Sequence, residues 1–215
     1  MKRIKLLGYY DYTVILTYTG MLCALVAIMM EINNRFLDAV MLLMIAGICD
    51  MFDGAVASTK TRDKSEKRFG VQIDSLSDLI SFGVMPGLFT YMICQKSRAS
   101  AVVACMYVLA ALIRLAYFNV TEEFRQDQTT ECRKCYSGVP VTTIAVLLPL
   151  VFLLVSKGRI PDGISFIVML VVCAIGFVSP FEIKKPKLAG KIALIAIGLT
   201  EIIGIVILRV TTGML

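Results

Sequence analysis

The stretch DMFDGAVASTKTRDKSEKRFGVQIDSLSD, residues 50–78, decides how this chain is expected to fold. It carries one pair of aspartates at each end, Asp50 with Asp53 and Asp74 with Asp78. Apolar runs flank it, MLLMIAGIC before and LISFGVMPGLF after. A carboxylate within a membrane segment is costly and usually marks a functional site. Four such groups in one stretch therefore indicate a shared partner, for which a cation is the simplest choice.

Composition indicates an integral-membrane protein. The chain has 215 residues, of which 58% are hydrophobic, and several apolar runs follow one another, whereas soluble domains are usually closer to half apolar. We therefore expect a single membrane domain over residues 1–215. Histidine is absent, so acid–base chemistry must use a carboxylate, lysine, tyrosine or cysteine.

The apolar runs predict an all-α, polytopic helical bundle. A membrane-spanning helix needs about 20 residues. The candidate spans cover residues 13–30, 37–57, 71–94, 99–120, 139–156, 163–180 and 190–209.

The basic residues predict the orientation of this bundle in a cell membrane. The segments 1–12, 58–70, 121–138 and 181–191 together hold 15 Lys and Arg, and the loops that alternate with them hold 5. By the positive-inside rule the N-terminus and the aspartate stretch lie at the cytoplasmic face. Basic loops facing anionic headgroups also account for the net charge of +6 without a nucleic-acid partner.

The spacing of the aspartates favours a metal site. Asp50 and Asp53 are three residues apart and Asp74 and Asp78 are four apart, so each pair shares one helix face. A helical hairpin could bring all four together, and a divalent cation would relieve their repulsion. All-oxygen ligands favour Mg²⁺ or Mn²⁺, with Ca²⁺ possible, and Mg²⁺ commonly bridges carboxylates to substrate phosphates. The alternative is a salt-bridge network with the basic residues of the intervening loop, Lys60, Arg62, Lys67 and Arg68.

The stretch also resembles a known family signature. The pattern is D-x2-D-G-x2-A followed by G-x3-D-x3-D, matched by Asp50, Asp53, Gly54, Ala57, Gly70, Asp74 and Asp78. It is similar to that of the CDP-alcohol phosphotransferases, and the resemblance covers roughly residues 9–190. The stretches IDSLSDLISFGVMPG (73–87), IRLAYFNV (113–120), YSGVPVTT (136–143) and EIKKPK (182–187) look most like the phosphatidylserine synthase branch.

The resemblance implies a mechanism for this chain. Asp50, Asp53 and Asp74 would ligate one divalent ion, and Asp50, Asp74 and Asp78 a second. Asp78 would be the general base that takes the hydroxyl proton of L-serine. The hydroxyl would attack CDP-diacylglycerol, giving phosphatidylserine and CMP. The family fold has six helices, so the last span would be an addition to it, and relatives are homodimers.

The resemblance also implies substrate contacts around the aspartates. Gly54 and Ala57 would leave room for the cytidine ring, and Gly70 for the start of the next helix. Ser58 stands where the family usually has arginine, and Lys60 or Arg62 are candidates to replace that arginine.

Three further contacts are expected from other segments. Thr17, with Thr13, stands where relatives often carry an asparagine facing the nucleotide. Arg114 lies within an apolar span, where it would bind serine or phosphate or else form a structural ion pair. Lys184, in the basic segment after the sixth span, would lie near the mouth of the site or attract lipid headgroups.

Two other functions remain open from sequence alone. One is the same chemistry with another acceptor, such as glycerol phosphate or inositol phosphate. The other is a cation transporter with a carboxylate relay. A transporter would more naturally place its acids at the bilayer midplane and in repeated halves, and no internal repeat is visible.

Overall fold

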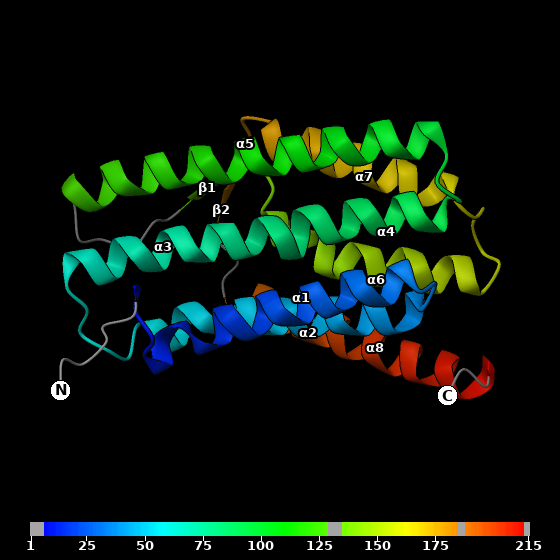
Figure 1. Ribbon diagram of the computed structural model, residues 1–215, viewed down its shortest axis with the longest axis horizontal. Helices are drawn as coiled ribbons and strands as arrows, with labels where there is room; N and C mark the ends of the chain where they lie inside the picture. Colours follow the sequence, from blue (N-terminus) through cyan, green and yellow to red (C-terminus); the bar gives the residue numbers. More distant parts are fainter. Residues whose placement is uncertain (1–6, 129–134, 185–187, 213–215) are drawn as a thin grey trace.

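The computed structural model describes residues 7–128, 135–184 and 188–212, which form an elongated bundle of helices (Figure 1). The elements in chain order are η1 (Tyr12–Val14), α1 (Ile15–Ile32), α2 (Phe36–Ala57), α3 (Lys64–Asp78), η2 (Leu79–Val84), α4 (Met85–Ile93), α5 (Arg98–Gln128), β1 (Cys135–Ser137), η3 (Val141–Thr143), α6 (Ile144–Ser156), α7 (Ile164–Val178), β2 (Glu182–Lys184) and α8 (Leu188–Thr212).

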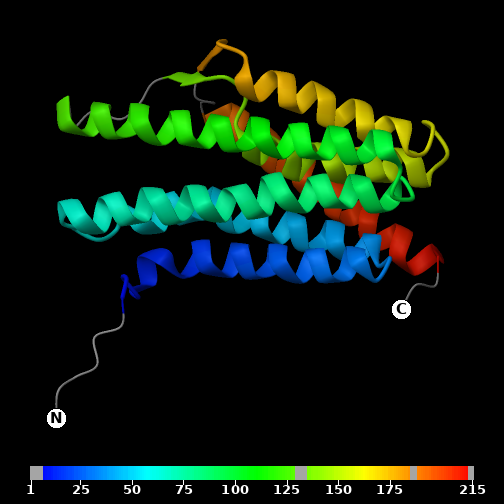
Figure 2. The ribbon, with the colours of Figure 1, turned by 45° about the horizontal axis from the view of Figure 1, so that its top comes forward.

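The predicted membrane bundle is confirmed. Each of the seven predicted spans is matched by a helical segment, with α3, η2 and α4 forming one continuous rod. Among the residues that the structure describes, four segments are long and apolar enough to cross a membrane by length and composition, namely Tyr12–Ile32, Phe36–Ala57, Lys64–Ile93 and Arg98–Arg125. The helices lie roughly along the long axis, so that α1 begins and α8 finishes at opposite ends of the bundle (Figure 2).

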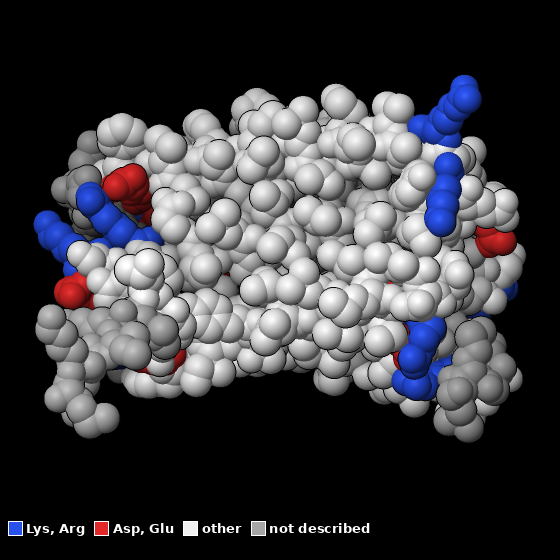
Figure 3. Space-filling model, viewed as in Figure 1, with Lys and Arg blue, Asp and Glu red and all other residues white. Residues whose placement is uncertain are grey.

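The surface of the bundle has the pattern that a bilayer requires. On the face shown in Figure 3, charged side chains gather at the two ends and an uncharged band separates them. Large apolar side chains are exposed along the helices, including Met106, Val172 and Ile203. An apolar girdle between two polar ends is stable where hydrocarbon covers the girdle.

Aromatic packing holds the interior of the bundle together. Phe89 of α4 is fully buried, and its ring centroid lies 5.4 Å from that of Phe36, 6.1 Å from that of Phe152 and 5.7 Å from that of Phe166. These partners belong to α2, α6 and α7. Tilted and edge-on ring contacts of this kind add to the burial of apolar area, so α4 is a central packing element.

A π-helical segment, η2, joins the polar helix α3 to the apolar helix α4. Pro86 has no backbone N–H, so it cannot donate the α-helical hydrogen bond to the carbonyl of Phe82. The hydroxyl of Tyr107, fully buried in α5, donates to that carbonyl at 2.6 Å. The proline therefore does not break the rod, because a neighbouring helix satisfies the acceptor that it leaves.

Two short strands form an antiparallel pair that the sequence did not predict. Tyr136 of β1 faces Ile183 of β2, and Cys135 faces Lys184. The pair joins the segment before α6 to the segment after α7. It is reinforced at Gly138, whose N–H donates to the carbonyl of Phe181 at 2.6 Å. These two stretches were among those that resembled the phosphatidylserine synthase branch.

Candidate metal and substrate site

The four aspartates of residues 50–78 come together near one end of the bundle. Asp50 and Asp53 lie in the last turns of α2, and Asp74 and Asp78 lie in the last turns of α3. One carboxylate oxygen each from Asp50, Asp74 and Asp78 lies within 4.8 Å of the others. The prediction that a helical hairpin gathers these side chains is therefore met by the geometry.

The predicted start of the helix that carries Asp74 and Asp78 was wrong. Asp74 was expected near its beginning, but α3 begins at Lys64. A capping box is the reason: the Asp63 side chain accepts from the Glu66 N–H at 2.7 Å, and the Glu66 side chain accepts from the Asp63 N–H at 3.2 Å. These reciprocal bonds satisfy donors that a helix start otherwise leaves open, so part of the expected loop is helical.

The aspartates also contact one another in pairs. The carboxyl groups of Asp50 and Asp78 lie next to one another, and so do those of Asp53 and Asp74. Two ionised carboxylates offer only acceptors, so each contact requires a shared proton or a bridging cation. A set of hard oxygen donors fits a divalent ion such as Mg²⁺ or Mn²⁺.

Helix α1 completes the wall of the site. The hydroxyl of Thr17 donates to Oδ2 of Asp53 at 3.0 Å, and the hydroxyl of Ser77 donates to the carbonyl of Thr17 at 3.2 Å. A cavity of about 10 Å³ lies between α1, α2 and the rod of α3 and η2. Its polar lining consists of Thr17, Asp50, Asp53, Ser77, Asp78 and Ser81. This volume suits one water-sized particle, and therefore an ion rather than a nucleotide.

Ser77 and Ser81 were missed in the sequence analysis. Ser81 follows Asp78 by three residues, a helical spacing that places the two on neighbouring parts of one surface. That signal was available in the stretch DSLSDLIS. Ser77 could not be found in this way, since its role depends on how α1 packs against α3.

Lys60 of the loop and Arg68 of α3 make ion pairs elsewhere. Nζ of Lys60 lies 2.6 Å from Oδ2 of Asp11 and 3.1 Å from Oε1 of Glu66. Nη2 of Arg68 lies 3.4 Å from Oε1 of Glu123. These pairs do not support the alternative in which the aspartates are neutralised by the loop.

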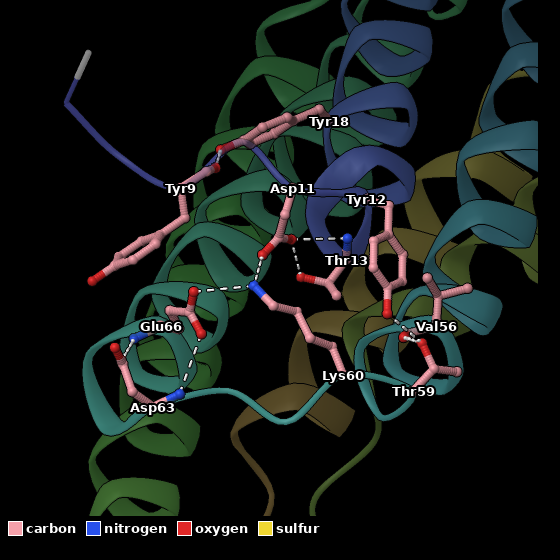
Figure 4. Close-up of polar contacts among 10 residues, drawn as sticks. All are labelled: Tyr9, Asp11, Tyr12, Thr13, Tyr18, Val56, Thr59, Lys60, Asp63 and Glu66. Carbon is pink, nitrogen blue, oxygen red and sulfur yellow. Dashed lines mark hydrogen bonds and ion pairs between the residues drawn. The ribbon is translucent and has the colours of Figure 1, made fainter. Parts of the chain in front are cut away.

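Lys60 links the N-terminal segment to the start of α3 through two ion pairs. Figure 4 shows its ammonium group between the carboxylates of Asp11 and Glu66. Asp11 also accepts hydrogen bonds from the backbone N–H and the hydroxyl of Thr13. The hydrogen bond from Lys60, followed by that from Thr13, lowers the pKa of Asp11 from 3.8 to about 2, and the same carboxylates raise the pKa of Lys60.

The small residues at the end of α2 differ in their surroundings. A Cβ added at Gly54 would meet nothing within 4 Å, so this surface is open. Ala57 is half-buried in the last turn. The hydroxyl of Ser58 donates to the carbonyl of Ala55 at 2.6 Å, so Ser58 caps its own helix in this structure.

The remaining predicted contacts lie outside the cavity lining. Gly70 faces Arg62, whose Nη1 would be 2.9 Å from a Cβ at position 70. Arg114 is buried, and its Nε donates to the carbonyl of Val139 at 3.4 Å, linking α5 to the segment that enters α6. The backbone of Lys184 lies in β2, and its side chain lies outside the described residues.

A family model described as CDP-alcohol phosphatidyltransferase matches residues 13–178, more than half of the chain. The chain belongs to this family. The match includes α1, both aspartate pairs and the helices through α7. It confirms the resemblance drawn from the aspartate motif, and it leaves α8 beyond the matched region.

Curated relatives in the CDP-alcohol phosphatidyltransferase family are similar to this chain over different lengths. A CDP-diacylglycerol–serine O-phosphatidyltransferase of Helicobacter pylori is 30% identical over 187 residues, which are 83% of this chain and 75% of the relative. One of Saccharomyces cerevisiae is 37% identical over 123 residues, 56% of this chain and 43% of the relative. An archaetidylserine synthase of Methanothermobacter thermautotrophicus is 33% identical over 123 residues, 57% of this chain and 49% of the relative. The chain thus spans less than half of the yeast protein and three quarters of the Helicobacter protein.

Family membership and the helical bundle together identify a multi-pass membrane protein. Members of this family generally use divalent metals, and the group of Asp50, Asp74 and Asp78 provides oxygen ligands at a suitable mutual distance. The transporter alternative finds no support in the family match.

Proposed function

We propose that this chain transfers the phosphatidyl group of CDP-diacylglycerol to L-serine, releasing phosphatidylserine and CMP. The convergence of the aspartates Asp50, Asp74 and Asp78 is the observation that carries the proposal, because this cluster suits a divalent ion that binds a diphosphate. The activity for which the Helicobacter relative is named supports the choice of serine as acceptor, and that relative aligns with 83% of the chain.

The aspartates would divide the metal-binding work between them. Asp50, Asp53 and Asp74 would hold one divalent ion, and Asp50, Asp74 and Asp78 a second, with Mg²⁺ or Mn²⁺ favoured and Ca²⁺ possible. Bound ions would neutralise the diphosphate and stabilise the attacking and leaving oxygens. The Thr17 hydroxyl orients Asp53 by the hydrogen bond at 3.0 Å.

Asp78 would be the general base. It lines the cavity at the junction of α3 and η2, and the chain has no histidine to take its place. Asp78 would accept the proton of the serine hydroxyl as that oxygen attacks the phosphorus that bears the diacylglycerol. The new P–O bond forms as the bond to the CMP oxygen breaks, and CMP leaves with the electron pair of that bond.

The open surface at Gly54 is where we place the cytidine ring, next to Ala57 and Ser58 at the end of α2. Gly54 offers space that no protein atom occupies within 4 Å of its would-be Cβ. We place Arg114 and Lys184 further out, where they would contact serine, phosphate or lipid headgroups.

We further propose that the site faces the cytoplasm of a cell-membrane protein and that the enzyme is a homodimer. The excess of Lys and Arg in the segments at the aspartate end supports the orientation through the positive-inside rule. The dimer rests on the family resemblance. The orientation is tested by the accessibility of cysteines to reagent on either side of sealed vesicles. The dimer is tested by the mass of the purified protein.

An acceptor panel tests the reaction itself. Purified protein with CDP-diacylglycerol and Mg²⁺ or Mn²⁺ is given labelled serine, glycerol phosphate or inositol phosphate, and lipid product and CMP are measured. We expect both products with serine and neither after chelation. Lipid product with another acceptor and none with serine would show that the acceptor is wrong.

Residue variants separate the two roles of the aspartates. We expect Asp78→Asn to abolish turnover while CDP-lipid binding is largely kept, and Asp50→Asn to weaken metal affinity as well. A near-normal rate for Asp78→Asn would remove it as the base.

A further inference from the structure

Arg62 lies against the backbone of α3 at the outer edge of the aspartate site. Its side chain is half-buried, and its Nη1 would be only 2.9 Å from a Cβ placed on Gly70. This approach is possible because glycine has no side chain. The guanidinium group is therefore held near position 70 and not extended into solvent.

Position 70 lies on the same face of α3 as the metal-binding aspartates. Gly70, Asp74 and Asp78 follow one another at intervals of four residues, a spacing that aligns side chains along one face of a helix. Four residues of helix rise by about 6 Å. Arg62 thus lies about one turn beyond Asp74, toward the start of α3.

Arg62 differs from Lys60 and Arg68, because among the described residues the structure shows no anionic partner for it. Lys60 is held between two carboxylates, and Arg68 lies 3.4 Å from Glu123. Over the part of the chain that the structure describes, Arg62 has no hydrogen bond or ion pair with another residue. A half-buried guanidinium without a partner is suited to a bidentate oxyanion such as phosphate.

We propose that Arg62 binds the diphosphate of the CDP-lipid at the end of the aspartate cluster that lies toward the start of α3. This inference rests on the proposed function and adds a residue to its substrate site. Ser58, at the position where the family usually has arginine, uses its hydroxyl to cap α2. Lys60 already balances Asp11 and Glu66, so Arg62 supplies the positive charge that position 58 lacks.

The test compares Arg62→Gln with Arg68→Gln, which removes the same charge from the same segment. The KM for CDP-diacylglycerol is measured in mixed micelles, with the KM for serine as an internal reference. We expect Arg62→Gln to raise the KM for CDP-diacylglycerol by about 10- to 100-fold, the range of one lost charge-assisted hydrogen bond. Arg68→Gln should change the KM for CDP-diacylglycerol by less than about twofold. The KM for serine should change by less than about twofold in both variants.

A binding measurement makes the test independent of turnover. Thermal stabilisation by CDP and by cytidine is compared in the presence of Mg²⁺. Wild type and Arg68→Gln should prefer CDP, and Arg62→Gln should lose most of that preference. Arg62→Lys should recover part of it, since lysine keeps the charge but not the fork of donors.

Gly70→Ala provides a second route if Arg62→Gln does not fold. The added methyl group displaces the guanidinium, so the KM for CDP-diacylglycerol should rise while the charge is unchanged. Unaltered KM and CDP preference in Arg62→Gln, or in Gly70→Ala where the first variant fails to fold, would overturn the role of Arg62. A wild-type protein that prefers CDP but forms no phosphatidylserine would instead refute the proposed reaction and leave the Arg62 test intact.

Discussion

Replacing Asp78 with asparagine should stabilise the metal-free protein. Oxygens of Asp50, Asp74 and Asp78 lie within 4.8 Å of one another, and two unit charges at that distance repel by about 3.5 kcal/mol at an effective dielectric constant of about 20. Asp78 takes part in two of the three pairs. At this separation the two pairs together repel by about 7 kcal/mol, and water and protons entering the site reduce the gain.

Divalent ions should reduce the difference in stability between Asp78→Asn and wild type. A ligand at 100 times its Kd adds about 2.7 kcal/mol to the free energy of unfolding, and wild type should gain this in Mg²⁺. Asp78→Asn has one ligand fewer and should gain less. Unfolding in detergent, followed with chelator and with saturating Mg²⁺, measures both quantities.

Asp38→Asn is the matched control for this experiment. Asp38 lies in α2, where its carboxylate pairs with Arg35 at 2.7 Å and Arg209 at 3.3 Å. Its loss should lower stability by about 1 kcal/mol or less and leave the gain in Mg²⁺ unchanged. If chelated Asp78→Asn were no more stable than chelated wild type, the argument from mutual repulsion would be refuted.

Three other predictions concern stability. Tyr107→Phe removes the donor to the carbonyl of the π-helical segment and should cost about 1–3 kcal/mol, whereas Tyr117→Phe, exposed on the same helix, should be neutral in the same unfolding assay. Gly138→Ala should cost about 1–3 kcal/mol in thermal unfolding, since its φ of +75° is unfavourable for alanine and a Cβ would lie 3.0 Å from two carbonyl oxygens. Because the pKa of Asp11 is lowered to about 2, the ion pair of Asp11 with Lys60 should be intact above pH 3.8 and be lost as pH falls through about 2. An NMR titration should show that the pKa of Asp11 moves toward 3.8 in Lys60→Gln.

The sequence predicted the helices well because their signal is local. Seven apolar runs of sufficient length became seven helical segments, and the aspartate spacing correctly placed each pair on one helix face. The error at the start of α3 arose because a polar stretch of lysines and glutamate resembled a loop. The pairing of Asp63 with Glu66 in a capping box was a sequence signal that could have corrected it.

Other features depend on contacts that sequence alone does not contain. Lys60 and Arg62 were equivalent candidates to replace the missing arginine, and they became different only because Asp11 reaches Lys60 from 49 residues away. The strands β1 and β2 pair across α6 and α7. Pro86 leaves the carbonyl of Phe82 without its α-helical donor, and only the structure shows that the hydroxyl of Tyr107 donates to that carbonyl.

The π-helical segment η2 sets the rotation of α4 relative to α3 within one continuous rod. An extra residue in a helical turn rotates all that follows by about 100° relative to a regular helix. The acidic face of α3 can therefore be oriented for chemistry while the aromatic face of α4 is oriented independently for packing around Phe89. Deleting one residue within 79–84 would restore a regular helix and bring these two faces out of phase, so the loss of activity would come with a loss of core packing.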